Sequence, residues 1–338
     1  MTKKLKTWQL AFLALLIIGT VMIVSRQHNT AYQHANGFIF GTVYNITYQY
    51  DSDLHSLIRD ELQKVDASLS PFNKTSVISA VNRNEDVVTD DMFAEVFDKA
   101  MTISRETDGA FDITVAPLVN LWGFGFRNDV PPTDRAVDSL RRLTGFDKVR
   151  MADRRVVKSD PRIMLDCSAI AKGYGCDVVA RLLRRRGVEN FMVEIGGEVV
   201  VSGVSSKRVP WRIGVNKPTE DSLSTANELQ ATLSITDRAM ATSGNYRNYY
   251  YKDGRRYAHT IDPRTGRPVQ HSLLSATVLA ADCATADAYA TAFMVMGMER
   301  ARKVLERHKE LMAYFIYSDD RGDFAVWASP SLEPRINK

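Results

Sequence analysis

The chain has 338 residues, with 44 lysines and arginines against 40 aspartates and glutamates, so its formal charge is +4. Hydrophobic residues make up 45% and charged residues 25%. This composition is ordinary for a globular protein and excludes a disordered, collagen-like or many-times membrane-spanning chain. A charge of +4 over this length is too small to indicate a nucleic-acid-binding protein.

The first 30 residues have the pattern of a leader segment. Lys3, Lys4 and Lys6 precede residues 7–25, which carry no charge. As a helix, this stretch would be about 28 Å long, close to the thickness of the hydrocarbon core of a membrane. Positive charge before an apolar stretch predicts that the rest of the chain lies outside the cytoplasm. We therefore expect residues 1–30 to be a membrane anchor or a signal segment.

The residues after the apolar stretch favour an anchor that is not cleaved. A signal-peptidase site needs small residues, whereas residues 24–28 read VSRQH. A cleaved signal stays open as the alternative. We expect residues 31–37 to form a short polar tether, residues 38–330 a single domain, and residues 331–338 a C-terminal tail.

The cysteine content predicts no disulfide framework. The chain has three cysteines, Cys167, Cys176 and Cys283. Cys167 and Cys176 fall in a segment with a helical pattern, where they would lie about 13 Å apart, too far to bridge. We expect all three to be buried side chains with free thiols.

The spacing of apolar residues predicts an α+β fold with a helix-rich first half and a sheet-rich second half. Helices are expected at residues 54–69, near 92–100, from Thr133 onward, from Ser168 or Ala169 to Arg186, at 284–296 and at 298–308. Strands are expected at 38–50, 191–195, 198–201, 211–215, 231–236, 257–261, 275–280 and 311–317.

Two turn-like segments in the second half carry polar groups suited to a ligand. Residues 242–244 read TSG and place hydroxyls and backbone amides where a turn could hold an anion. Residues 259–268 read HTIDPRTGRP, with His259 at the end of a strand beside a hydroxyl and a carboxylate. A histidine in this setting is a candidate for acid–base chemistry or phosphate contact. Gly196-Gly197 fits a plain hairpin as well as a ligand-binding turn.

Asp287 and Thr291 lie one turn apart in the alanine-rich helix expected at 284–296. A carboxylate beside a hydroxyl, among small residues, could bind a hard cation. The alternative is that Asp287 only favours the dipole at the start of the helix.

Residues 165–177 read LDCSAIAKGYGCD. Asp166 ends a strand-like stretch, and Ser168 could cap the following helix. Lys172 lies in the first turn of that helix, where the dipole prefers an anion, so a bound phosphate would explain a lysine there. Gly173 and Gly175 weaken a helix and indicate that something approaches closely.

Taken together, these segments resemble the ApbE family, the FAD:protein FMN transferases. The matching segments, in chain order, are GT at 41–42, LSPF at 69–72, GAFD at 109–112, LWGF at 121–124, DCSAIAKGYGCD at 166–177, EIGG at 194–197, TSGNY at 242–246, HTIDPRTG at 259–266, and AD at 286–287 followed by Thr291. Each segment alone is weak, but their order over most of the chain is specific.

The resemblance implies a T-fold-like domain that binds FAD and Mg²⁺, cleaves the FAD pyrophosphate, and joins FMN to a threonine or serine hydroxyl of a target protein with release of AMP. It implies Mg²⁺ ligands at the backbone carbonyl of Ala169, the carboxylate of Asp287 and the hydroxyl of Thr291. Contacts to FAD would fall at Phe40, Phe72, Ala110, Phe111, Asp112, Asp166, Lys172 and Ile261. We expect His259 to be catalytic.

The resemblance further implies an acceptor that is a subunit of a membrane redox complex, such as a sodium-pumping quinone reductase (NQR) or an RNF-type complex. Together with the leader, it implies a location on the periplasmic side of a bacterial inner membrane. Two alternatives stay open. One is a Mg²⁺-dependent FAD pyrophosphatase that gives FMN and AMP, and the other is a non-catalytic, membrane-tethered flavin-binding protein.

Overall fold

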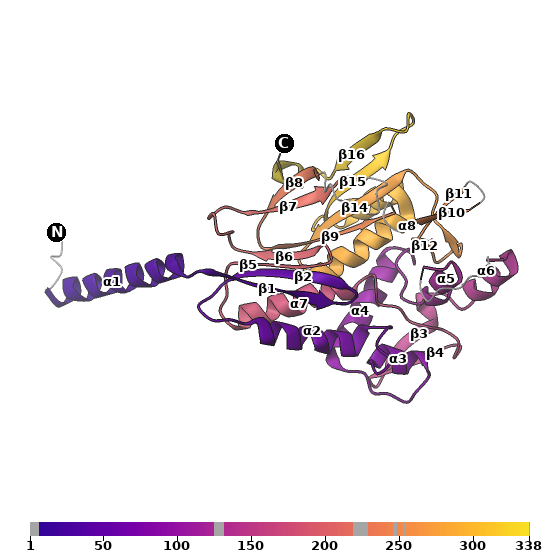
Figure 1. Cartoon of the computed structure of the whole chain (residues 1–338), viewed down its shortest axis with the longest axis horizontal. Helices are drawn as coiled ribbons and strands as arrows, with labels where there is room; N and C mark the ends of the chain where they lie inside the picture. The colour runs from indigo at the N-terminus through magenta and orange to yellow at the C-terminus, as the bar shows by residue number, and fades with distance from the viewer. Residues whose placement is uncertain (1–6, 125–131, 219–228, 246–248, 253–254, 338) are drawn as a thin grey trace.

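A computed structural model describes residues 7–124, 132–218, 229–245, 249–252 and 255–337. Its first helix, α1 (Thr7–Asn29), points away from the body of the molecule (Figure 1). Within the described part of the chain, no helix combines the length and the apolarity that crossing a membrane requires.

An antiparallel sheet of eight strands runs through the body, in the order β1-β2-β5-β6-β9-β14-β15-β16. Its strands are β1 (Tyr32–Ile39), β2 (Thr42–Gln49), β5 (Phe191–Ile195), β6 (Glu198–Ser202), β9 (Arg238–Gly244), β14 (Leu273–Ala280), β15 (Met312–Ser318) and β16 (Phe324–Ala328). Seven of the eight residues of β14 are buried, because the centre of the sheet is covered on both faces.

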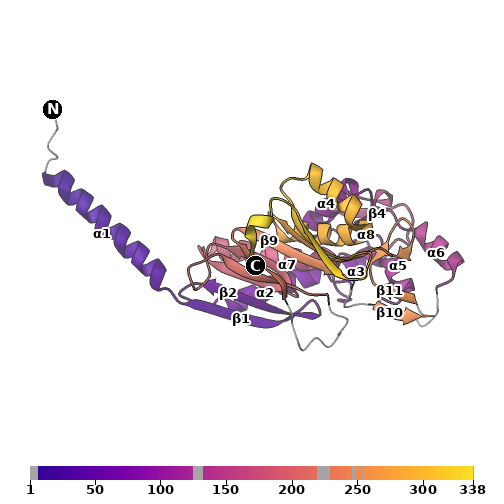
Figure 2. The ribbon, with the colours of Figure 1, turned by 90° about the horizontal axis from the view of Figure 1, so that it is seen from above.

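Helices cover one face of this sheet (Figure 2). The two that pack most extensively on it are α7 (Ala171–Arg185) and α8 (Cys283–Arg307). The other helices of the body are α2 (His55–Leu69), α3 (Val77–Asn82), α4 (Asp91–Glu106), α5 (Ala116–Leu121) and α6 (Asp134–Arg141), with a 3₁₀ turn at Phe146–Lys148. α8 bends at Gly297, whose φ of 74° lies outside the helical range, so it consists of two helical segments, as expected from the sequence.

A second, three-stranded sheet packs on the opposite face. It contains β7 (Trp211–Asn216), β8 (Leu229–Ile235) and β17 (Ile336–Asn337), preceded by a 3₁₀ turn at Glu333–Arg335. Apolar side chains of β6, β9, β14 and β15 meet those of β7 and β8 in one buried cluster. Three small hairpins complete the fold: β3 (Val149–Ala152) with β4 (Arg155–Lys158), β10 (Tyr249–Lys252) with β11 (Arg255–Ala258), and β12 (Ile261–Asp262) with β13 (Arg267–Pro268).

The expectation of an α+β fold, with helices mostly in the first half and sheet in the second, is confirmed. The tether expected at residues 31–37 is wrong, since these residues belong almost entirely to β1, which pairs along its whole length with β2. β1 forms the edge of the sheet, where a polar strand is tolerated.

The tail expected at residues 331–338 is also wrong for its described part. β17 pairs with β8, and Leu332 is completely buried. Residues 242–244 do not form the expected turn either, because they belong to β9 and pair with β14. The three cysteines are buried and free, as predicted.

Candidate active site

A cleft of about 1150 Å³ brings together every residue for which the sequence predicted a role in the site. The lining residues come from both halves of the chain. In the first half they belong to the turn between β1 and β2, the end of α2 and the segment before α5. In the second half they belong to the start of α7 and the segment before it, the turn between β5 and β6, β7, β9, residues 259–263 and α8. The predicted residues that line it are Phe40, Phe72, Ala110, Phe111, Asp112, Asp166, Ala169, Lys172, His259, Ile261, Asp287 and Thr291. Their individual roles stay predictions.

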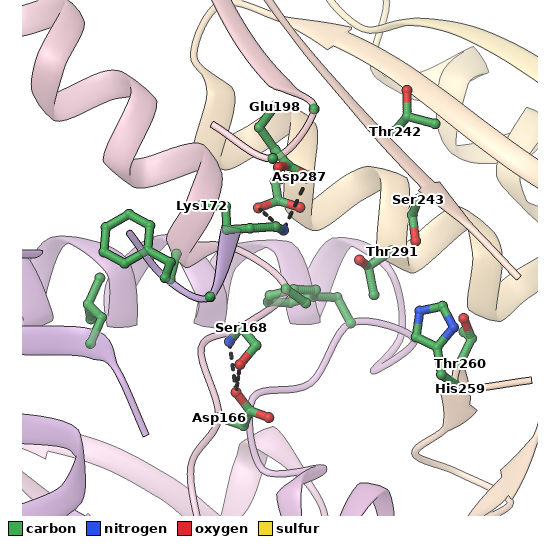
Figure 3. A pocket seen from close by; sticks show the side chains of 18 of the residues that line it. Asp166, Ser168, Lys172, Glu198, Thr242, Ser243, His259, Thr260, Asp287 and Thr291 are labelled. Atoms are coloured by element: carbon green, nitrogen blue, oxygen red, sulfur yellow. Dashed lines mark hydrogen bonds and ion pairs between the residues drawn. The ribbon is translucent and has the colours of Figure 1, made fainter. Parts of the chain in front are cut away.

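At the centre of the cleft, one ammonium group lies between two carboxylates (Figure 3). The Nζ atom of Lys172 is 3.2 Å from Oε1 of Glu198 and 3.9 Å from Oδ2 of Asp287. The side chains of Glu198 and Asp287 are only 5% and 6% exposed, whereas that of Lys172 is 29% exposed. Counted as ionised groups, the three side chains leave one negative charge in a buried place, which favours binding of a cation.

The burial of this cluster perturbs its protonation equilibria. Burial raises the pKa values of Glu198 and Asp287, although the charge of Lys172 opposes the shift. Burial also acts to lower the pKa of Lys172, but the charges of Asp287 and Glu198 outweigh it, so the pKa is raised. Lys172 therefore stays a cation at neutral pH.

The position of Asp287 is fixed by the close packing of α7 against α8. The backbone N–H of Gly173 donates to Oδ2 of Asp287 over 3.0 Å. A β-carbon at Gly173 would lie 2.3 Å from the carbonyl oxygen of Cys283, so only glycine permits this approach. Gly175 makes room in the same way for the ring of Phe40. The close approach predicted for both glycines is confirmed.

A second carboxylate, from Asp177 on α7, caps α8. It accepts hydrogen bonds from the backbone N–H groups of Cys283 and Ala284, over 2.8 and 2.9 Å. The N-cap residue of α8, Asp282, accepts from the N–H of Thr285. Burial raises the pKa of Asp177 to about 7. The backbone N–H groups at the start of α8 thus donate to two carboxylates other than that of Asp287. Capping of the helix therefore does not explain why an aspartate stands at position 287.

The segment before α7 forms a turn rather than the first turn of the helix. Oδ1 of Asp166 accepts from the backbone N–H of Ser168 over 2.8 Å and from its hydroxyl over 2.5 Å. α7 begins at Ala171 with Ile170 at the N-cap, so the expected capping role of Ser168 is wrong. The Asp166 turn has the form of an Asx-turn and positions Ala169 at the wall of the cleft.

His259 also lines the cleft, and in Figure 3 it lies apart from Lys172, on the far side of Thr291. Its ring packs edge-on against Phe124, with 6.3 Å between ring centroids. The residue that follows, Thr260, donates its hydroxyl to Oδ1 of Asn245 over 2.5 Å. Nε1 of Trp122 donates to the carbonyl of Gly266 over 2.8 Å and so holds the β12–β13 hairpin against α5. Phe124, the last residue of the LWGF segment, thus packs beside His259 and lines the cleft with it.

The oxygen donors expected for a metal ion lie in the same cleft. Ala169, Asp287 and Thr291 offer a carbonyl, a carboxylate and a hydroxyl, which are hard ligands of the type that Mg²⁺ prefers. Among the described residues, no group of three or more His, Cys, Asp or Glu side chains is arranged to hold a metal. A set with one carboxylate and two neutral oxygens fits Mg²⁺, which keeps several of its waters.

Sequence reasoning missed Glu198, which is the carboxylate nearest to Lys172. It is the first residue of β6, and all but the last residue of this strand are buried. The sequence did carry a signal for this residue, because a glutamate directly after Gly-Gly begins a strand that is otherwise apolar. Thr242 and Ser243 line the cleft, but they do so from the central strand β9 and not from the expected turn.

The fold and the cleft define the class of protein. A family model described as the ApbE family matches residues 40–315. The chain belongs to the ApbE family.

Individual relatives agree with this assignment. The chain is 38% identical to the FAD:protein FMN transferase of Vibrio cholerae serotype O1, over 99% of this chain and 100% of the relative. It is 32% identical to the FAD:protein FMN transferase of Escherichia coli K12, over 91% of this chain and 90% of the relative. The solved flavin transferase ApbE from Vibrio cholerae superposes with a TM-score of 0.82 at 39% identity, covering 90% of this chain and 99% of that structure. The solved apo flavinyl transferase ApbE of Pseudomonas stutzeri superposes with a TM-score of 0.80 at 30% identity, covering 90% of this chain and 96% of that structure.

Proposed function

We infer that this chain is an FAD:protein FMN transferase. It cleaves the pyrophosphate of FAD, transfers FMN to a threonine or serine hydroxyl of a target protein, and releases AMP. The observation that carries this proposal is the single cleft in which all the expected residues meet, in a chain of the ApbE family. We also propose that the architecture is T-fold-like, with the antiparallel sheet carrying its helices on one face.

The walls of the cleft offer separate places for the parts of FAD. Phe40 lines the cleft at the β1–β2 turn, and Phe72, which is 67% exposed, lines it after α2. Aromatic side chains in such positions can pack on a flavin ring. The ammonium of Lys172 carries the positive charge that a pyrophosphate requires.

Ala169, Asp287 and Thr291 would hold Mg²⁺. When bound, this ion neutralises the charge on the phosphoryl oxygens of the transition state. Asp287 is suited to this task because the Gly173 N–H fixes its Oδ2 atom while its charge stays available.

The transfer conserves atoms and charge. The hydroxyl oxygen of the acceptor forms a bond to the phosphorus of the FMN half, and the bond from that phosphorus to the bridging oxygen breaks. AMP leaves with the bridging oxygen. His259 accepts the proton of the incoming hydroxyl, a step that a nearby imidazole performs well at neutral pH.

We propose that the acceptor is a subunit of a membrane redox complex of the NQR or RNF type, and that the reaction takes place on the periplasmic side of a bacterial inner membrane. The lysines before the apolar stretch at residues 7–25 support this location. Co-expression with a candidate subunit, followed by mass spectrometry, should find FMN attached to a threonine or serine.

One experiment separates the transferase from the pyrophosphatase and from a flavin-binding protein. The purified protein is incubated with FAD and Mg²⁺, with and without the candidate acceptor. A transferase gives flavin fluorescence on the acceptor band of a denaturing gel, together with AMP. Free FMN and AMP without labelled acceptor would indicate the pyrophosphatase, and no AMP in either reaction would indicate a binding protein.

A further inference from the structure

Glu198 has no task in the proposed transfer, yet it is placed at the centre of the cleft. Its side chain is 5% exposed, and its Oε1 atom lies 3.2 Å from the ammonium of Lys172. The other oxygen, Oε2, is buried and has no hydrogen-bond partner among the described residues. A buried carboxylate that is only half satisfied is costly, so its presence calls for a reason.

Lys172 has two carboxylates within reach and contacts them unequally. Its distance of 3.2 Å to Glu198 is a charge-assisted hydrogen bond, whereas its distance of 3.9 Å to Asp287 is at the limit of an ion pair. Lysine has a flexible stem with four methylene groups, so its ammonium can move between such partners. A direct pair with Asp287 would occupy the carboxylate that a divalent cation needs.

The other two members of the cluster have little freedom to move. Glu198 pairs with Ile195 across the β5–β6 turn, and its backbone carbonyl accepts from the thiol of Cys176. Asp287 is held by the N–H of Gly173. Which carboxylate Lys172 pairs with is therefore decided by the competition between them.

We propose that Glu198 is a positioning residue that holds Lys172 away from Asp287 and so leaves the carboxylate of Asp287 free for a divalent cation. This inference rests on the proposed function, because it takes Asp287 as a ligand of the metal. The proposed effect depends on the length of the Glu198 side chain, which brings its carboxylate to the Lys172 ammonium, and not only on its negative charge.

The test measures binding of Mn²⁺ alone, by the electron paramagnetic resonance signal of the free ion, to the purified full chain without FAD. Glu198→Asp keeps the charge but withdraws the carboxylate by one methylene group. We expect it to weaken Mn²⁺ binding about tenfold, as is typical when an outer partner of a metal ligand is lost. Glu198→Gln keeps the shape but loses the charge, and we expect a similar loss.

A second substitution completes the test. Lys172→Met, added to Glu198→Asp, removes the competing ammonium and should restore Mn²⁺ binding to at least the level of the unmodified chain. Glu95→Ala is the matched control, because it removes the ion pair between Glu95 of α4 and Arg181 of α7, and neither residue lines the cleft. We expect it to leave Mn²⁺ binding unchanged, and circular dichroism shows that each variant is folded.

The proposal is overturned if Glu198→Asp binds Mn²⁺ as tightly as the unmodified chain. It is also overturned if the double variant binds as weakly as Glu198→Asp alone, because Glu198 would then be a ligand itself. Asp287→Asn separates these failures from a failure of the metal assignment. If Asp287→Asn leaves Mn²⁺ binding unchanged, the metal site of the proposed function is wrong as well.

Discussion

The backbone of Gly173 on α7 lies against the carbonyl group of Cys283, the first residue of α8, so closely that a β-carbon at Gly173 would be 2.3 Å from its oxygen. This contact joins two segments that are distant in the sequence. It also allows the Gly173 N–H to reach Asp287. The packing of α7 against α8 and the geometry of the cleft thus both depend on a glycine at position 173.

Gly173→Ala should therefore both destabilise the fold and impair the site. The new methyl group has to push α7 and α8 apart, and overpacking of this kind costs about 1–3 kcal/mol. Urea unfolding measures the loss of free energy, and Mn²⁺ binding measures the displacement of Asp287. Gly19→Ala in α1 is the control, because a β-carbon there meets nothing within 4 Å. Equal stability of the two variants would contradict the close packing.

His259→Ala should stop the transfer while FAD still binds. Loss of a general base lowers rates by about 10²–10⁴-fold, whereas the aromatic and cationic groups of the cleft are untouched. Flavin fluorescence of the acceptor band measures transfer, and quenching of FAD fluorescence measures binding. His34→Ala, on β1 and outside the cleft lining, should behave like the unmodified chain. Unchanged flavin transfer by His259→Ala would remove this histidine from the mechanism.

Asp287→Asn should abolish the dependence of activity on Mg²⁺ together with most of the activity. The amide oxygen can still accept from Gly173, so the fold is preserved, but the charge that attracts the cation is lost. Transfer rates measured over a series of Mg²⁺ concentrations test this. Asp98→Asn on the exposed face of α4 is the matched control. A normal Mg²⁺ titration curve for Asp287→Asn would exclude it as a ligand.

The sequence predicted which residues gather around the cleft where their signal was local. Lys172 was noticed because a lysine is unusual in the first turn of a helix, and Gly173 because a glycine weakens a helix. Both signals depend only on the residues next to them in the sequence. The resemblance to the ApbE family added the remaining positions for the same reason, since its motifs are short and contiguous.

The sequence did not predict what depends on distant contacts. Glu198 is notable because it pairs with Lys172, on another element, and because it is buried at the start of β6. The residues next to it in the sequence reveal neither fact. Residues 242–244 have the composition of a turn, but pairing with β14 makes them a strand. Residues 31–37 have the composition of a tether although most of them belong to β1, because an edge strand may be polar and then resembles a loop in composition.

His271 should make the stability of the fold depend on pH. Its Nε2 atom lies 2.8 Å from the carbonyl of Met294 in α8, and its ring packs beside Gly297 at the bend of that helix. Partial burial of the ring lowers the pKa of His271 in spite of the hydrogen bond to Met294. The folded state therefore favours the neutral ring, whereas the unfolded chain takes up a proton near pH 6.5.

It follows that the unfolded chain binds more protons below about pH 6.5, so the free energy of unfolding falls as the pH is lowered through this value. Above it, the contribution of His271 is constant. His271→Gln can still donate to the Met294 carbonyl but does not titrate, so it should flatten this part of the pH profile. Urea unfolding at pH 5.5, 6.5 and 7.5 measures both chains. The same slope in the variant and the unmodified chain would assign the pH dependence to other groups.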